Sequence, residues 1–290
     1  MMSFNDEYAR YKQIIEDEIR VFSDTLDCHD ELKAAITYSL FAGGKRVRPI
    51  MFLACLDMLG CNYIEYVKLA VAIECVHTYS LIHDDLPALD NDDYRRGKLS
   101  NHKIFGEGMA ILAGDALLNC AFELALSCVS DGKTLNAVKY FFACSGQKGM
   151  INGQAYDLYY EDRVIDDKEL ILQSLQNNKT GKLLTAPLVM AALISGEQSI
   201  SDFEELGRLT GVIFQFSDDL LDVNGTFKEV GKTVGKDGYA GKLTAISVYG
   251  VQRTIDIIDE TFLSIIKILK NFDRNTFFIN FYNYIRSRRN

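Results

Sequence analysis

Apolar side chains recur every three or four positions along most of the chain, which is the spacing of one face of an α-helix. Strand-like alternation is scarce, and the breaks carry Gly, Ser and Asp. Near-continuous apolarity in 107–129 further predicts a helix buried at the centre of a bundle. The pattern therefore predicts an all-α fold of about ten or more helices, near 6–24, 30–41, 48–60, 65–85, 107–129, 133–160, 167–194, 200–224, 241–270 and 273–288.

The composition predicts one domain over residues 1–290. The chain has only three prolines, and no Ser-, Gly- or Gln-rich run separates one half from the other. Its formal charge of −9, from 31 basic and 40 acidic residues, argues against nucleic acid as the main partner.

Seven cysteines without C-x-x-C spacing lie mostly in apolar runs, which indicates free thiols in a reducing compartment. The N-terminus lacks the pattern of a signal peptide. No uncharged stretch has the length of a membrane span. We therefore expect a cytoplasmic, soluble protein without stable membrane insertion.

Two aspartate clusters stand about 130 residues apart, each in an otherwise apolar stretch. Carboxylates in such surroundings need a cation or hydrogen-bond donors. In the second cluster, Asp218 and Asp222 are four positions apart, so both lie on one face of a helix while Asp219 is turned away. That face offers two oxygen ligands.

The first cluster, Asp84, Asp85 and Asp90, is interrupted by Pro87, which breaks a helix. A short irregular link can then return Asp90 toward Asp84. Two carboxylate walls facing each other inside a bundle would bind Mg²⁺, a hard cation that commonly couples carboxylates to a phosphate. Either cluster alone could instead be a solvated helix end.

Basic residues accompany these clusters. The run Lys45-Arg46-Val47-Arg48 follows a glycine turn where a helix begins, and exposed N–H groups there favour an anion. Arg95 and Arg96 follow the first cluster, and their planar guanidinium groups suit phosphate oxygens. Taken singly, each is more often a solvated side chain. Together, acidic and basic groups fit a reaction between two phosphorylated molecules. Further cations are Lys179, Lys182, Lys232 and Lys242.

In these motifs the chain resembles the trans-isoprenyl diphosphate synthases, specifically the short-chain farnesyl and geranylgeranyl type, over nearly its whole length. The resemblance is carried by Gly-Gly-Lys45-Arg46-Val-Arg48-Pro, His77-Thr-Tyr-Ser-Leu-Ile-His-Asp84-Asp85-Leu-Pro-Ala-Leu-Asp90, Arg95-Arg96-Gly, Lys179-Thr180-Gly, Phe214-Gln215-Phe-Ser-Asp218-Asp219-Leu-Leu-Asp222, Gly231-Lys232 and Gly241-Lys242.

The resemblance implies an isoprenoid synthase fold, with a bundle of helices around a central active-site cavity, and a homodimer. It implies several Mg²⁺ ions that bridge the allylic diphosphate to Asp84, Asp85, Asp90, Asp218, Asp219 and Asp222. Contacts to the allylic diphosphate would come from Arg95, Lys179, Thr180, Gln215, Lys232 and Lys242. Isopentenyl diphosphate would be held by Lys45, Arg48, His77 and Arg96. In the tail, Arg288 resembles a closing residue.

The implied reaction is prenyl transfer. Metal and cations stabilise the departing pyrophosphate, and the allylic carbon becomes a carbocation that the double bond of isopentenyl diphosphate attacks. A proton is then lost to the released pyrophosphate. The catalytic residues implied by the resemblance are Arg95, Lys179, Thr180 and Gln215.

The length of the product would depend on the face of the helix preceding Asp84. Tyr79 lies about 7 Å earlier along the helix axis, and Tyr79 and Ser80 are the expected chain-length residues. An aromatic residue here, together with the two extra residues Pro87-Ala88, resembles bacterial farnesyl diphosphate synthases. A farnesyl product is expected, with geranylgeranyl diphosphate as the alternative and an ordinary core role for Tyr79 left open.

Two positions depart from the family pattern, since Leu99 replaces a proline and Asn152 a glycine. Both could alter loop stiffness, but neither removes a proposed charge. A terpene cyclase would have no second diphosphate for Lys45 and Arg48, and a non-catalytic partner subunit typically loses one aspartate cluster. A di-iron bundle would need several Glu-x-x-His pairs, whereas Glu74 with His77 supplies one.

Overall fold

The protein is seen in a computed structural model that describes residues 3–161, 163–224 and 243–287. The all-α prediction is confirmed, because one short hairpin is the only sheet in that part of the chain. The chain divides into two compact units, the first of Met1–Leu53 and Asn62–Asp131 and the second of Ala54–Cys61 and Gly132–Asn290. The assignment of 1–290 to one domain stays a prediction.

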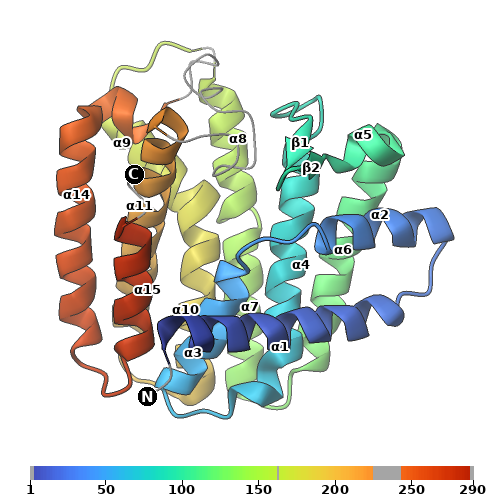
Figure 1. Ribbon diagram of the computed structural model, residues 1–290, viewed down its shortest axis with the longest axis horizontal. Coiled ribbons are helices and arrows are strands. Elements are labelled where there is room, and N and C mark those ends of the chain that lie inside the picture. The colour runs from blue at the N-terminus through green and yellow to red at the C-terminus, as the bar shows by residue number, and fades with distance from the viewer. Residues whose placement is uncertain (1–2, 162, 225–242, 288–290) are drawn as a thin grey trace. The chain divides into compact units, whose positions relative to one another are not determined.

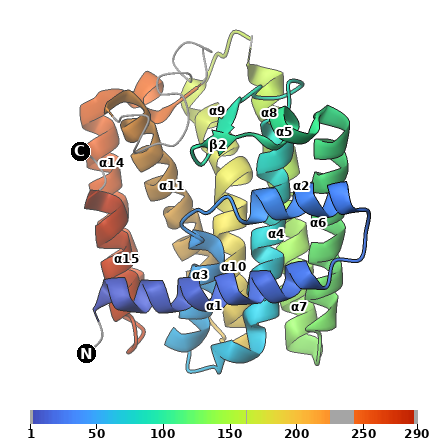
Figure 2. The same cartoon turned by 45° about the vertical axis from the view of Figure 1, so that its right-hand side comes forward.

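The first unit pairs crossing helices with a small hairpin (Figure 1). The helix α3 begins in this unit and ends in the second. In Figure 2, α1 and α2 run across the direction of α4 and α6. The elements of the first unit are α1 (Phe4–Asp24), α2 (Asp30–Leu40), α3 (Val47–Met58), η1 (Tyr63–Tyr66), α4 (Val67–Asp84), β1 (Tyr94–Arg95), β2 (Lys98–Leu99), α5 (Asn101–Phe105) and α6 (Glu107–Ser127).

The helix α4 forms the centre of the first unit, because most of its side chains are buried. The neighbouring α6 presents a stripe of small residues to it. A Cβ atom added at Gly114 would lie 2.1 Å from Nε2 of His83, so this glycine allows the close approach of the two helices. The buried residues of α6 are Ala110, Ala113, Gly114, Leu117, Ala121 and Ala125.

The prediction that 107–129 forms a helix buried at the centre of the bundle is wrong, because one face of α6 is exposed. Leu112 and Leu126 of α6 are 54% and 58% exposed, and Ile111 and Phe122 are exposed with them. By length and composition α6 also qualifies as a membrane span, although a third of that stretch is buried inside the protein. Apolarity on all sides of a helix indicates contacts on all sides, and this helix has one face covered and one open.

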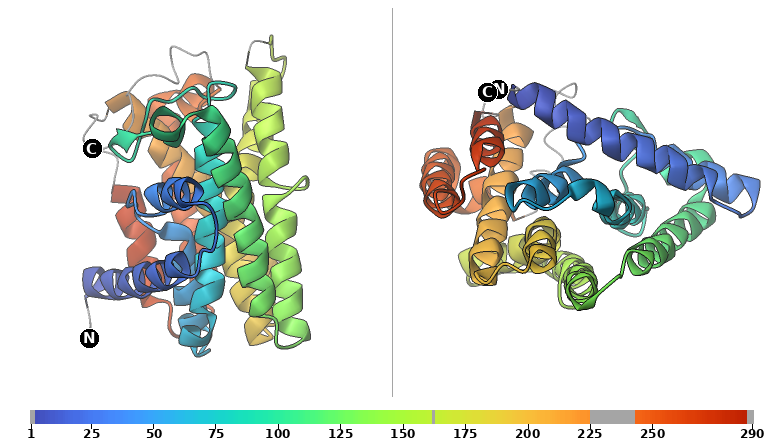
Figure 3. Two further views of the ribbon diagram at one scale, coloured as in Figure 1. Left: turned by 90° about the vertical axis from the view of Figure 1, so that its right-hand side faces the viewer. Right: turned by 90° about the horizontal axis from the view of Figure 1, so that it is seen from below.

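The second unit contains longer, roughly aligned helices. Figure 3 shows α7 and α8 running in nearly one direction, joined by a short break. The elements are α7 (Gly132–Ser145), α8 (Met150–Tyr160), α9 (Lys168–Leu175), the π-helix η2 (Gln176–Gly181), α10 (Lys182–Ser195), α11 (Ile200–Asn224), α14 (Ala245–Leu269) and α15 (Thr276–Ser287).

Two predicted helices of this unit are interrupted. The expected helix 133–160 breaks between Gly146 and Gly149, where a Cβ at Gly149 would lie 1.8 Å from the carbonyl oxygen of Cys144. The expected helix 167–194 contains η2, a rare π-helical turn of the kind that often occurs at functional sites. Both segments keep helical spacing of apolar residues, so the pattern alone does not show the interruptions.

Close packing around α10 and α11 fixes the π-helical turn in the second unit. A Cβ at Gly211 of α11 would lie 2.8 Å from Cα of Gly181, which allows α11 to pass directly over the end of η2. At the neighbouring position of α11, a buried hydrogen bond of 2.6 Å joins Thr210 and the hydroxyl of Tyr282 on α15. The backbone that carries Lys179 and Thr180 is therefore held against a well-packed core.

Candidate active site

The first aspartate cluster lies at the C-terminal end of α4. Asp84 is the last residue of the helix, and the backbone N–H of Asp90 donates to the carbonyl oxygen of Asp84 at 2.9 Å. The chain therefore turns back on itself after Pro87. This confirms the prediction that the link returns Asp90 toward Asp84.

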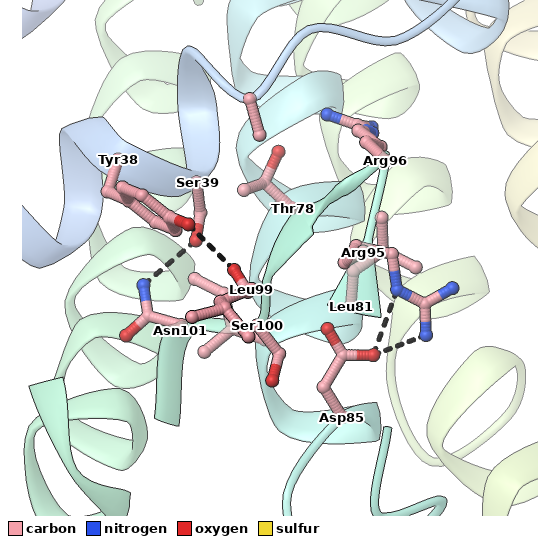
Figure 4. A pocket seen from close by; sticks show the side chains of 12 residues that line it. Tyr38, Ser39, Thr78, Leu81, Asp85, Arg95, Arg96, Leu99, Ser100 and Asn101 are labelled. Carbon is pink, nitrogen blue, oxygen red and sulfur yellow. Dashed lines mark hydrogen bonds and ion pairs between the residues drawn. The ribbon is translucent and has the colours of Figure 1, made fainter. Parts of the chain in front are cut away.

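Asp85 holds an arginine of the hairpin. Nε of Arg95 donates to Oδ1 of Asp85 at 2.9 Å, and the Nη2 group of Arg95 donates to the same oxygen (Figure 4). Burial raises the pKa of Asp85 to about 6, an effect that Arg95 opposes. Asp85 thus positions Arg95, which leaves Asp84 and Asp90 as the better candidates for metal ligands in this cluster.

The basic loop after α2 is fixed by its backbone and by Arg46. The hydroxyl of Tyr8 donates to the carbonyl oxygen of Lys45 at 2.5 Å. Arg96 reaches this loop from the hairpin, since its Nη1 group donates to the carbonyl oxygen of Gly43 at 2.5 Å. Arg46 points inward and is buried. Of the three cations in the run, Arg46 therefore has a structural role, and the resemblance assigns Lys45 and Arg48 to the substrate.

Arg48 lies beside His77, and the resemblance assigns both residues to isopentenyl diphosphate. Nη1 of Arg48 is 3.3 Å from Nε2 of His77. Burial, and then the charges of Arg48 and the neighbouring arginines, hold the pKa of His77 well below its usual range. A neutral His77 accepts a hydrogen bond from Arg48 through Nε2 and so orients this guanidinium group.

The second aspartate cluster lies on α11 in the second unit. Oδ1 of Asp219 accepts from Nε2 of Gln215 at 2.9 Å, and Oδ2 accepts from the backbone N–H of Ala245 at 2.7 Å. The hydroxyl of Thr180 donates to Oε1 of Gln215 at 3.0 Å. The structure therefore brings Thr180 and Gln215 together, and Asp219 supports this pair while Asp218 and Asp222 share the helix spacing of two ligands.

Lys179 has a partner that the sequence did not reveal. Its Nζ atom lies 2.5 Å from Oδ2 of Asp157 on α8, and both side chains are about one quarter exposed, at 27% and 25%. The glycine at 153 allows this arrangement, because a Cβ there would lie 2.2 Å from the backbone nitrogen of Lys179. Spacing along the chain gives no signal for this pair, because 22 residues separate Asp157 from Lys179.

The donors of each cluster suit a hard divalent cation. Within the described ranges no three His, Cys, Asp or Glu side chains gather as a complete protein-only metal site. Carboxylates spaced along one helix face or around one turn instead provide a few oxygen ligands each. Mg²⁺ uses such sites when phosphate oxygens and water complete its shell.

Comparison with known proteins agrees with this chemistry. The sequence profile of the polyprenyl synthetase family matches residues 29–276. The chain belongs to this family. The matched region includes every predicted site residue except Arg288.

Several relatives of this chain are named as prenyl diphosphate synthases or geranyltransferases. A farnesyl diphosphate synthase of Micrococcus luteus is 44% identical over 232 residues, 79% of each chain. Geranylgeranyl pyrophosphate synthase 4 of Arabidopsis thaliana is 44% identical over 243 residues, 82% of this chain and 65% of that one. The Helicobacter pylori geranyltransferase, solved with magnesium and isoprenyl diphosphate, has a TM-score of 0.82 at 31% identity over 99% of this chain and 95% of that one. The isoprenoid synthase fold is thus confirmed.

The proposed chain-length residues of this polyprenyl synthetase lie on α4, one turn before the first aspartates. Tyr79 is 5% exposed and its ring packs edge-on against His83, with centroids 5.8 Å apart. In the described part of the chain its hydroxyl has no hydrogen-bond partner, and burial raises the pKa of Tyr79 to about 12. Ser80 instead donates to the carbonyl oxygen of His77 at 2.8 Å. Lys232, Lys242 and Arg288 lie outside the described residues.

Proposed function

We propose that this polyprenyl synthetase is a short-chain prenyltransferase. It condenses isopentenyl diphosphate with dimethylallyl or geranyl diphosphate to farnesyl diphosphate and releases pyrophosphate. The observation that carries the proposal is the basic cluster of the first unit, where His77 contacts Arg48 and Arg96 donates to the carbonyl oxygen of Gly43. A terpene cyclase has no second diphosphate that would use this cluster.

The basic cluster and the aspartate clusters bind different diphosphates. Arg48, His77 and Arg96 bind isopentenyl diphosphate through direct charge-assisted hydrogen bonds. The resemblance assigns Arg95 of the first unit and Lys179 of the second unit to the allylic diphosphate, and a carboxylate pre-orients each of them. Asp84, Asp90, Asp218 and Asp222 are the residues that would hold Mg²⁺, which when bound withdraws negative charge from the diphosphate leaving group.

The remaining residues act on the reacting carbon atoms. Thr180 and Gln215 form a hydrogen-bonded pair whose oxygen atoms can stabilise the positive charge that develops on the allylic carbon. The C1–O bond of the allylic diphosphate breaks, and the double bond of isopentenyl diphosphate forms the new C–C bond. The proton lost from that adduct goes to the pyrophosphate, so no protein nucleophile is needed.

The test is incubation of the protein with Mg²⁺, isopentenyl diphosphate and each allylic diphosphate from C5 to C15. Pyrophosphate release with the C5 or C10 primer and a C15 product is the expected result. The absence of pyrophosphate release with every primer would sink the enzyme proposal.

Geranylgeranyl diphosphate synthase is the second candidate, and the similarity to plant geranylgeranyl synthases supports it. The buried aromatic ring of Tyr79 favours the C15 product, because a ring on the helix face below the allylic site takes up space that a longer chain needs. Replacing Tyr79 with Ala is expected to shift the main product from C15 to C20 or longer, as measured by chromatography of the dephosphorylated alcohols. A main product that stays C15 would show that Tyr79 does not limit elongation.

We also propose a homodimer in the cytoplasm. The open face of α6 carries the exposed apolar side chains Ile111, Leu112, Phe122 and Leu126, and an exposed apolar patch of this kind marks a contact surface for another protein. The proposal for the compartment rests on a separate observation, since the seven cysteines are all free, as suits a reducing compartment. Sedimentation equilibrium is expected to give twice the mass of the chain, and Leu112→Glu is expected to give the monomer, with Glu65→Gln as the surface control.

A further inference from the structure

We propose that Glu74, a buried carboxylate on α4, is a positioning residue for the isopentenyl diphosphate half of the site. Its Oε1 atom accepts hydrogen bonds from two arginines, at 2.5 Å from Nη1 of Arg46 and 3.5 Å from Nη2 of Arg96. Glu74 is 1% exposed. It therefore touches no substrate, and it acts through the two arginines. The assignment rests on the function proposed above.

Arg46 is a structural cation, because its hydrogen-bonding capacity is used inside the protein. A guanidinium group has five N–H donors. Arg46 donates through Nε and Nη2 to Glu16 on α1, through Nη1 to Glu74, and through Nη2 to the carbonyl oxygen of Leu40 at the end of α2. Its side chain is fully buried. Arg46 thus ties the basic loop to α1, α2 and α4.

Arg96 is held in place by hydrogen bonds that use only some of its N–H donors. Its bonds within the described residues are those to the carbonyl oxygen of Gly43 and to Glu74, so three of its five N–H donors stay available for an anion. A Cβ at Gly44 would lie 2.8 Å from Cζ of Arg96, so the loop packs directly on the guanidinium group. Figure 4 shows Arg96 extending from the hairpin above Thr78. Glu74 and Gly43 therefore fix the direction in which Arg96 presents its remaining donors.

The charge of Glu74 allows two arginines to lie close together. Burial and the charge of Arg46 both lower the pKa of Arg96, and Glu74 counters them. Without this carboxylate, Arg46 keeps Glu16 as a partner, whereas Arg96 loses its only anionic contact among the described residues. Repulsion from Arg46 then displaces Arg96 from the orientation that suits a diphosphate.

The test is Glu74→Gln, which preserves shape and removes charge. The KM for isopentenyl diphosphate is expected to rise about 10-fold or more, the effect of a lost charge-assisted interaction. The KM for the allylic diphosphate should stay within about 3-fold, because Arg95 and Lys179 do not contact Glu74. The matched control is Glu16→Gln, which removes the other carboxylate on Arg46 without touching Arg96 and should leave both KM values within about 3-fold.

A double substitution tests whether Glu74 acts through Arg96. Arg96→Gln alone should raise the KM for isopentenyl diphosphate, and adding Glu74→Gln to it should raise it by less than about 3-fold more. Additive effects, equal rises for both substrates or an unchanged KM in folded Glu74→Gln would overturn the assignment. If Glu74→Gln does not fold, Glu74→Asp replaces it under the same criteria, because the shorter side chain keeps the charge but gives up the 3.5 Å contact with Arg96.

A binding measurement separates this proposal from the proposed function. Calorimetric titration of isopentenyl diphosphate, without an allylic substrate, should give about 10-fold weaker binding to Glu74→Gln than to the wild type and to Glu16→Gln. A wild type that binds isopentenyl diphosphate but releases no pyrophosphate would contradict the prenyltransferase proposal and still test Glu74. Equal binding by all three proteins contradicts the role of Glu74.

Discussion

Replacing Asp84 with Asn is expected to lower kcat/KM for prenyl transfer by about 1,000-fold, the size of effect seen when one stabilising group of a charged transition state is lost. The turn should survive, because it is closed by the backbone bond from Asp90 N–H to the carbonyl oxygen of Asp84 rather than by the carboxylate. The loss should therefore fall on catalysis, with little change in the free energy of unfolding. The rate of pyrophosphate release under saturating Mg²⁺ measures the loss in kcat/KM.

The control for this substitution is Asp93→Asn. It removes the same charge nine residues further along the chain, from a carboxylate that is 56% exposed and paired with Lys103 at 2.9 Å. A surface ion pair of this kind contributes at most about 1 kcal/mol. Activity of Asp84→Asn within about 10-fold of the control would contradict the metal-binding assignment of Asp84.

The features that the sequence predicted well depend on local chemistry. The helix 200–224 was expected with the bounds that the structure gives it, because a helical apolar pattern runs without interruption between its ends. The turn that joins Asp84 and Asp90 was predictable from Pro87, since proline excludes a continuous helix. Spacing along the chain is sufficient evidence when the contact in question spans one turn.

The features that were missed depend on contacts between distant segments. Asp157 pairs with Lys179, and Glu74 serves two arginines from separate loops, and neither pairing follows from spacing. The open face of α6 was predicted to be buried because sequence shows that a side chain is apolar but not which surface covers it. The π-helical turn at 176–181 escaped notice for a similar reason, since its cause is the packing of glycines against it.

Gly153→Ala is expected to lower kcat about 100-fold, although it adds a single methyl group. The new Cβ would lie 2.2 Å from the nitrogen and 2.6 Å from Cα of Lys179, and backbone atoms cannot rotate away as a flexible side chain can. The π-helical turn must therefore shift, and Lys179 and Thr180 shift with it. A displacement of about 1 Å in a positioning element can reduce the rate by this factor.

Overpacking of this kind should also reduce the free energy of unfolding by about 1–3 kcal/mol. Gly132→Ala is the matched control, because α7 begins at this glycine in the same unit and a Cβ there meets nothing within 4 Å. Gly132 is the first residue of its helix, so Ala there should change the free energy of unfolding by less than about 1 kcal/mol. Urea denaturation should therefore show a lower free energy of unfolding for Gly153→Ala but not for Gly132→Ala. Steady-state kinetics should show a lower kcat for Gly153→Ala alone. A fully active Gly153→Ala would show that η2 can shift without moving the catalytic side chains, and the π-helical turn would then lose its proposed role in positioning Lys179.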